Sequence, residues 1–157
     1  MATTILLVDD HPLFRKGLRL LLEEQNDFRI VGEAGDGREA IDRVRKHSPD
    51  VVIMDITMPD FNGIDATRKI VAEDSSAKVV ALSMHAGKRF VEDMLKAGAA
   101  GYILKKSVPE DLVNAIRMVI QGDIYLSPAI TGIVVSEYKE LLAMSPATAQ
   151  IEDASPI

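Results

Sequence analysis

The sequence contains no cysteine among its 157 residues. A disulfide framework, a thiolate zinc site and a cysteine nucleophile are therefore all excluded. The absence of disulfides is typical of proteins kept in a reducing compartment, and we expect a cytoplasmic protein.

Long apolar runs and an excess of basic residues are also missing. The N-terminus has no signal peptide pattern, and no run approaches the roughly 20 apolar residues of a membrane span, so no membrane association is expected. The formal net charge is −6. Because binding to nucleic acid phosphates needs clustered Lys and Arg, these residues are not expected to bind DNA by themselves.

Short β-like apolar runs alternate with helical patterns along most of the chain. With 47% hydrophobic residues, the sequence can form one well-packed domain. Five βα units are expected by about residue 121, which predicts a doubly wound α/β fold with a five-stranded parallel sheet and helices on both faces. The expected strands are residues 5–8, 29–34, 51–54, 78–83 and 101–104.

The C-terminal residues follow a different pattern. Ser127-Pro128 resembles the start of a helix, and the apolar spacing beyond it predicts a C-terminal helix within an extension of residues 123–144. Residues 145–157 are rich in Ser, Ala and Pro, which favours a flexible linker or tail.

Charged residues follow three of the predicted strands directly. Asp9-Asp10, Asp55 and Lys105 each come at the end of an apolar run. Because ligands of open α/β sheets bind at the carboxyl ends of the strands, these groups are expected to converge. Two carboxylates about 4 Å apart repel each other by roughly 4 kcal/mol at an effective dielectric near 20. A divalent cation would relieve this repulsion, and Mg²⁺ prefers such oxygen ligands.

The predicted magnesium ligands are Asp10, Asp55 and the backbone carbonyl of Thr57, with Asp9 close by or acting through water. Asp55 follows the most apolar strand and is the better candidate for a nucleophile that attacks a phosphoryl donor. Lys105 and the Ser83 hydroxyl could then stabilise the transferred oxygens.

Each of these residues alone also has an ordinary structural explanation. A single aspartate is more often a helix cap, and a single lysine is more often a solvated charge. The chemical interpretation depends on all the strand ends carrying compatible groups. The histidines at 11, 47 and 85 show no metal-ligand spacing, and the last two are expected at the surface.

Several segments together resemble the receiver domain of two-component response regulators. These segments are Leu7-Val8-Asp9-Asp10, Val52–Pro59 with Gly63, Leu82-Ser83, and Gly98–Lys105. The resemblance covers roughly residues 3–122 and assigns residues 1–122 to a receiver domain. It implies a flavodoxin-like sheet of order 2-1-3-4-5.

The same resemblance implies the role of each site residue. Asp55 would accept a phosphoryl group from a sensor histidine kinase, Asp9 and Asp10 would hold Mg²⁺, and Lys105 would contact the phosphoryl oxygens. Ser83 and Tyr102 would form a switch pair in which Ser83 moves toward the phosphoryl group and Tyr102 turns inward. Such a domain is a signalling phosphoacceptor that catalyses only its own phosphorylation and dephosphorylation, and not an enzyme.

The opening Asp9–Pro12 and the segment Gly122–Pro128 further resemble the subfamily of transcriptional regulators that carry a LuxR-type helix-turn-helix. Lys106 follows Lys105 where many receivers have proline. The resemblance implies transcriptional control through a DNA-binding domain that follows the linker, and we expect this sequence to be truncated before it. Homodimerisation on phosphorylation is expected, through the face of the fourth helix, fifth strand and fifth helix, or through the first and fifth helices.

Three alternatives come from other classes of protein. A haloacid dehalogenase-like phosphatase would need a second acid two residues after Asp55, where Thr57 stands. A flavodoxin-like flavin carrier would need a phosphate loop after the first strand, where Asp9 and Asp10 would repel the phosphate. The third alternative is a stand-alone receiver that regulates a protein partner without DNA.

Overall fold

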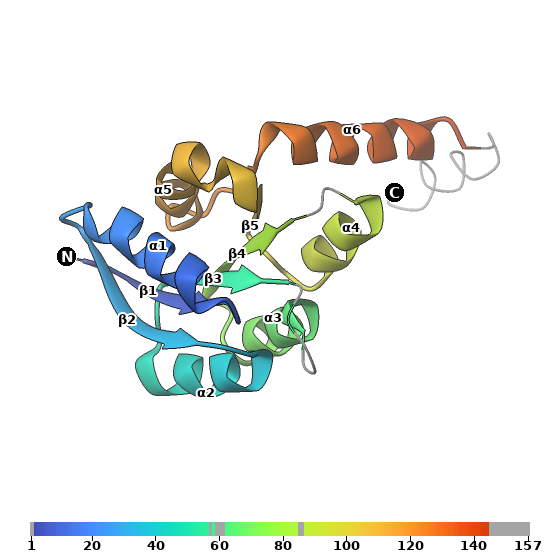
Figure 1. The fold of residues 1–157 in the computed structure, drawn as a ribbon. Helices are drawn as coiled ribbons and strands as arrows, with labels where there is room; N and C mark the ends of the chain where they lie inside the picture. The colour runs from blue at the N-terminus through green and yellow to red at the C-terminus, as the bar shows by residue number, and fades with distance from the viewer. Residues whose placement is uncertain (1, 57, 59–61, 85–86, 145–157) are drawn as a thin grey trace.

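The computed structural model describes residues 2–56, 58, 62–84 and 87–144 (Figure 1). The strands form one parallel sheet of order β2-β1-β3-β4-β5-β6. The strands are β1 (Thr3–Val8), β2 (Phe28–Ala34), β3 (Val51–Asp55), β4 (Lys78–Ser83), β5 (Gly101–Leu104) and β6 (Tyr125–Leu126). The helices are α1 (Pro12–Glu23), α2 (Gly37–His47), α3 (Gly63–Glu73), α4 (Lys88–Lys96), α5 (Val108–Val119) and α6 (Pro128–Leu142), with a 3-10 turn, η1, at Lys105–Ser107.

Helices cover both faces of the sheet, as predicted (Figure 1). In β1, Ile5 and Leu7 belong to the core cluster that includes residues of α1 and α5, whereas Leu6 and Val8 belong to the cluster that includes residues of α2, α3 and α4. This alternation follows from the two-residue period of a strand, which directs successive side chains to opposite faces. All five residues of β3 are buried, which explains why its sequence is continuously apolar until Asp55.

The sheet has six strands, so the predicted count of five was wrong by one, while the predicted order 2-1-3-4-5 is confirmed. The additional strand β6 pairs in parallel with β5. The Tyr125 amide donates a hydrogen bond of 3.0 Å to the Ala100 carbonyl, and the Ser127 amide donates one of 3.1 Å to the Tyr102 carbonyl. A two-residue strand is too short to show the alternating pattern from which strands are predicted. Its position at the sheet edge leaves little exposed backbone for pairing with other chains.

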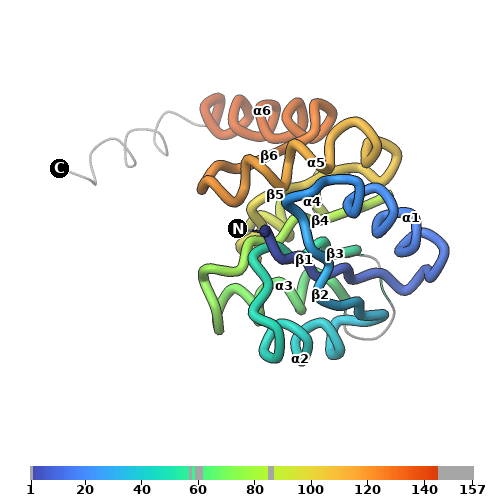
Figure 2. Tube along the Cα trace, turned by 90° about the vertical axis from the view of Figure 1, so that its left-hand side faces the viewer, coloured from blue at the N-terminus to red at the C-terminus, as the bar shows by residue number. Residues whose placement is uncertain are grey.

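The predicted C-terminal helix is present as α6, which lies next to β6 (Figure 2) and also contacts α4. Ile130 is fully buried in the core cluster that also contains Tyr102. Lys88 of α4 pairs with Glu137 at 2.7 Å and with Glu140 at 3.0 Å. Residues 145–157 lie outside the described part of the chain, and the predicted domain division at residue 122 stays a prediction. Among the described helices, none combines the length and apolar character needed to cross a membrane.

Candidate functional site

Three carboxylates converge where β1 and β3 end. Asp9 and Asp10 follow β1 directly, and Asp55 is the last residue of β3. Because β1 and β3 are neighbours, each of these residues and His11 offers a ligand atom within 4.8 Å of the others. Asp9 and Asp55 have no exposed surface, so their charges are screened little by water.

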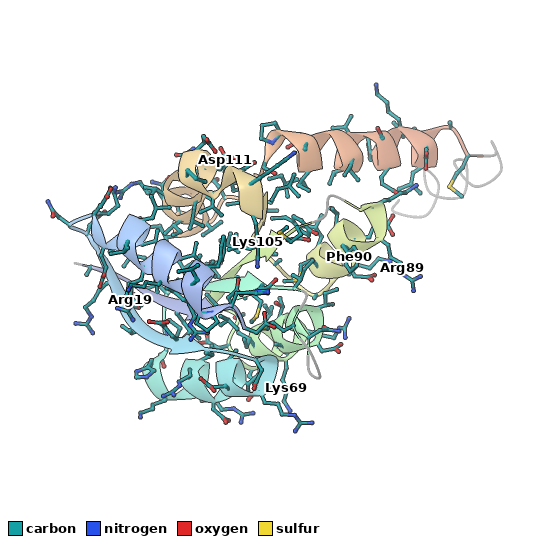
Figure 3. The ribbon with its side chains drawn as sticks, in the orientation of Figure 1. Arg19, Lys69, Arg89, Phe90, Lys105 and Asp111 are labelled. Atoms are coloured by element: carbon teal, nitrogen blue, oxygen red, sulfur yellow. The ribbon has the colours of Figure 1, made fainter. Side chains whose placement is uncertain are left out.

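Lys105 supplies the positive charge next to these carboxylates. It begins η1 directly after β5, and Figure 3 shows it near the middle of the molecule. Its Nζ lies 2.9 Å from Asp9 Oδ2 and 3.6 Å from Asp55 Oδ2, and the side chain is only 7% exposed. The ammonium also lies over the Phe14 ring of α1, 4.5 Å from the ring centre. This cation–π contact helps to hold the ammonium against the acids.

The arrangement fits a divalent cation. With His11 neutral, three carboxylates and one ammonium leave a formal charge of −2, which one divalent ion would balance. Within the described residues, Asp10 Oδ1 is buried and accepts no hydrogen bond, as a carboxylate oxygen suited to a hard cation would be. Thr57, the predicted carbonyl ligand, lies outside the described residues.

His11 belongs to this cluster, which the sequence did not indicate. Its Nδ1 lies 2.9 Å from Asp9 Oδ1 and 3.1 Å from Asp10 Oδ1, while its side chain is 63% exposed. The metal-ligand spacings sought in the sequence place ligands several residues apart on regular elements. Here the turn between β1 and α1 folds the ring back onto its own neighbours, and Pro12 begins the helix directly afterwards.

Arg15 of α1 contacts the turn that carries Asp9. Arg15 donates a hydrogen bond to the Asp9 carbonyl and pairs with Glu33 of β2 at 2.7 Å. Arg19 also pairs with Glu33 at 2.7 Å. Burial alone would raise the pKa of Glu33, but hydrogen bonds and charges from the two arginines outweigh burial and lower that pKa. The ionised Glu33 thus connects β2 to the helix that follows the acidic turn.

Gly63 lets α3 begin directly against the end of β3. A Cβ atom at this position would lie 2.2 Å from the Asp55 carbonyl oxygen and 2.7 Å from the Ile56 Cα. The Asn62 side chain caps the helix by accepting a hydrogen bond from the Asp65 amide at 3.0 Å. Glycine and the cap together fix the backbone around Asp55.

The two predicted switch residues are in contact. Ser83 ends β4, one residue beyond the register partner of Asp55, and Tyr102 lies on β5. Both are fully buried. Burial raises the pKa of Tyr102, and its hydrogen bond with Ser83 opposes this shift only in part. Tyr102 therefore already occupies the inward position that the prediction assigned to the phosphorylated form.

Of the predicted site residues, the structure brings together Asp9, Asp10, Asp55 and Lys105. Ser83 lies on the strand next to Asp55, where its hydroxyl bonds to Tyr102. The peptide bond between Lys105 and Lys106 is trans, in line with the absence of proline there. The site thus combines a buried acidic cluster, one ammonium and a hydroxyl pair that reaches β5, the strand next to the edge strand β6.

Known protein families and proteins resemble this chain in sequence. The profile of the response regulator receiver domain matches residues 5–117. The transcriptional regulatory protein DegU of Brevibacillus brevis is 39% identical over 138 residues, which cover 88% of this chain and 58% of DegU. The chain therefore spans less than two thirds of the length of this relative.

Solved structures of response regulators are also similar to this chain. The chain is similar to a two-component response regulator of the LuxR family from Aurantimonas sp., with 40% identity, a TM-score of 0.84 and coverage of 88% of this chain and 99% of that one. It is also similar to RcsB in a structure of two RcsB dimers bound to two parallel DNAs, with 26% identity, a TM-score of 0.78 and coverage of 85% and 68%.

Proposed function

The chain belongs to the family of response regulator receiver domains, and we propose on that basis that Asp55 accepts a phosphoryl group from a sensor histidine kinase. The observation that carries this proposal is the convergence of buried Asp9, Asp55 and Lys105 at the ends of three parallel strands. The predicted nucleophile, its acidic neighbour and a counter-charge lie within reach of one another. A purely structural cluster would have no need to bury Asp55 beside a second carboxylate.

In the proposed reaction, an oxygen of Asp55 attacks the phosphorus of a phosphohistidine. An oxygen–phosphorus bond forms, the phosphorus–nitrogen bond breaks, and the histidine leaves with the electron pair and takes up a proton. Later attack by water on phosphorus releases inorganic phosphate and restores the carboxylate. The protein contributes mainly position and charge, as phosphoryl transfer requires.

Asp9, Asp10 and Asp55 are the residues proposed to hold Mg²⁺. When bound, Mg²⁺ would neutralise charge on the carboxylates and on the phosphoryl oxygens. Lys105 would contact the phosphoryl oxygens from the other side, because its Nζ already lies 3.6 Å from Asp55 Oδ2. The Phe14 ring would keep the ammonium in place during the exchange of partners.

Ser83 and Tyr102 are proposed to transmit the modification. A phosphoryl group on Asp55 would compete for the Ser83 hydroxyl, which now bonds to Tyr102. Tyr102 pairs with Leu126 of β6, and the Ser127 amide donates a hydrogen bond to the Tyr102 carbonyl. A change at Ser83 would therefore reach β6 and α6 through Tyr102.

We propose that the phosphorylated form dimerises through α1 and α5. β6 and α6 cover the outer side of β5 and part of α4. By contrast, Leu13 of α1 is 83% exposed and borders an open groove of about 650 Å³ between α1 and α5. Lys105 lines this groove and also lies 3.6 Å from Asp55, so a displacement of Lys105 on phosphorylation would change the lining of the proposed interface.

Transcriptional control is the proposed output, with the DNA contact made outside these 157 residues. DegU is named a transcriptional regulatory protein, and the related RcsB binds DNA as dimers. The net charge of −6 is unfavourable for contact with DNA phosphates. A receiver that regulates a protein partner without DNA is the alternative, and a cytoplasmic location stays a prediction for both.

Phosphorylation of Asp55 can be tested with acetyl phosphate and Mg²⁺. The parent protein should take up one acid-labile phosphoryl group, detected by mass spectrometry of the intact chain. Asp55→Asn should take up none, because the amide is not a nucleophile, whereas Asp65→Asn at the surface of α3 should behave like the parent. Equal labelling of Asp55→Asn and the parent would show that the phosphoacceptor is another residue.

A further inference from the structure

The His11 ring lies against the acidic cluster. Its Nδ1 lies within 3.1 Å of carboxylate oxygens from both Asp9 and Asp10. These three residues and Asp55 form the group of four whose ligand atoms all lie within 4.8 Å of one another. The imidazole therefore shares one small volume with the three proposed magnesium ligands.

The distances around His11 match those between ligands of one metal ion. Adjacent ligands of an octahedral ion with bonds of about 2.1 Å lie about 3.0 Å apart, and opposite ligands lie about 4.2 Å apart. Nδ1 lies 2.9 Å from Asp9 Oδ1 and 3.1 Å from Asp10 Oδ1. The ring is thus at the separation expected of a ligand adjacent to either carboxylate.

The ring can serve as a ligand without loss of the local turn. The His11 backbone amide donates a separate hydrogen bond to Asp9 Oδ1 at 2.8 Å, and this bond fixes the turn whatever the ring does. A neutral imidazole that carries its proton on Nε2 leaves the lone pair of Nδ1 free to bind a metal. With 63% of the side chain exposed, solvent can supply the remaining ligands.

We propose that His11 is a direct metal ligand that makes this site favour first-row transition-metal ions over Mg²⁺. Imidazole nitrogen binds Ni²⁺ and Zn²⁺ well, whereas Mg²⁺ prefers oxygen from carboxylates and water. Three carboxylates alone would accept Mg²⁺, and one added nitrogen shifts the preference. This inference rests on the proposed function, because it uses the same acidic cluster.

Isothermal titration calorimetry with Ni²⁺ and with Mg²⁺, at one fixed pH, separates this role from a simple hydrogen bond. His11→Asn is expected to weaken Ni²⁺ binding by at least about tenfold and to change Mg²⁺ binding by less than about threefold. His47→Asn on α2 serves as the matched control and should retain the parent's preference. If His11 only orients the carboxylates, its replacement will change both metals by the same factor.

A direct observation does not depend on any variant. Pulsed electron paramagnetic resonance of bound Mn²⁺ in the parent protein should show coupling to an imidazole nitrogen, which should disappear in His11→Asn. Three results would overturn the proposal. They are absence of this coupling in the parent, an equal loss of Ni²⁺ and Mg²⁺ binding in His11→Asn, and loss of the Ni²⁺ preference in the control variant. Failure of the proposed function would be seen separately, as phosphorylation of Asp55→Asn with the metal preference intact.

Discussion

Replacing Gly63 by alanine tests whether the backbone around Asp55 depends on the close approach of α3. The added Cβ would lie 2.2 Å from the Asp55 carbonyl oxygen, where about 3.2 Å is the shortest comfortable contact, so helix and strand must separate by about 1 Å. Overpacking of this kind costs about 1–3 kcal/mol. The added Cβ would meet the Asp55 carbonyl oxygen and the Ile56 Cα, and these backbone atoms cannot rotate away. We therefore expect the free energy of unfolding to fall by an amount near the upper end of this range, about 2–3 kcal/mol.

Urea denaturation monitored by circular dichroism measures this loss directly. The same loss of unfolding free energy should also lower the melting temperature by about 5–10 °C, at about 2–4 °C per kcal/mol for a chain of this size. Phosphorylation by acetyl phosphate should also slow, because the same separation displaces Asp55. Both effects have one cause, so they should appear together.

Gly17→Ala is the matched control for the alanine substitution. Gly17 lies within α1, and no atom lies within 4 Å of the position its Cβ would take. Its replacement should stabilise the protein by about 0.5–1 kcal/mol through helix propensity alone. Two results for Gly63→Ala would contradict the idea that the close contact between Gly63 and Asp55 fixes the Asp55 backbone. One is a stability equal to that of the parent, and the other is a loss of stability without slower phosphorylation.

Two further outcomes are expected. Leu13→Glu should keep the phosphorylated protein monomeric in sedimentation experiments, while Tyr138→Glu on α6 should still dimerise; the opposite result would move the interface to α6. Glu33→Gln should destabilise the protein at neutral pH. Since the folded-state pKa of Glu33 is lowered, its stabilising effect is present above the ordinary value of 4.5 and is lost as the pH falls through the folded-state value. The two proteins should therefore differ less in urea midpoint in acid; an unchanged difference would exclude the charge as its cause.

The convergence of Asp9, Asp55 and Lys105 could be predicted because each follows an apolar run and parallel strands end at one edge. Such an argument depends only on strand order, which βα alternation and right-handed crossovers restrict strongly. Burial of Tyr102 was likewise foreseeable as ordinary core packing of an aromatic residue in a strand.

Other features depend on contacts that no pattern along the chain encodes. His11 joins the cluster because a tight turn reverses its ring onto Asp9 and Asp10. Phe14 reaches Lys105 from a helix about 90 residues earlier, and only the three-dimensional packing of α1 reveals it. The strand β6 consists of two residues whose pairing depends on the existing edge of β5.

The connection between β6 and α6 has a mechanical consequence. The Ser127 amide bonds to the Tyr102 carbonyl, and the next residue begins a helix of 15 residues, about 22 Å long. A tilt of about 5° at the base of this helix displaces its far end by about 2 Å. A backbone shift at Tyr102 that tilts α6 by this amount would therefore move Leu142 furthest, and it would displace Glu137 and Glu140 from Lys88 of α4 on the way.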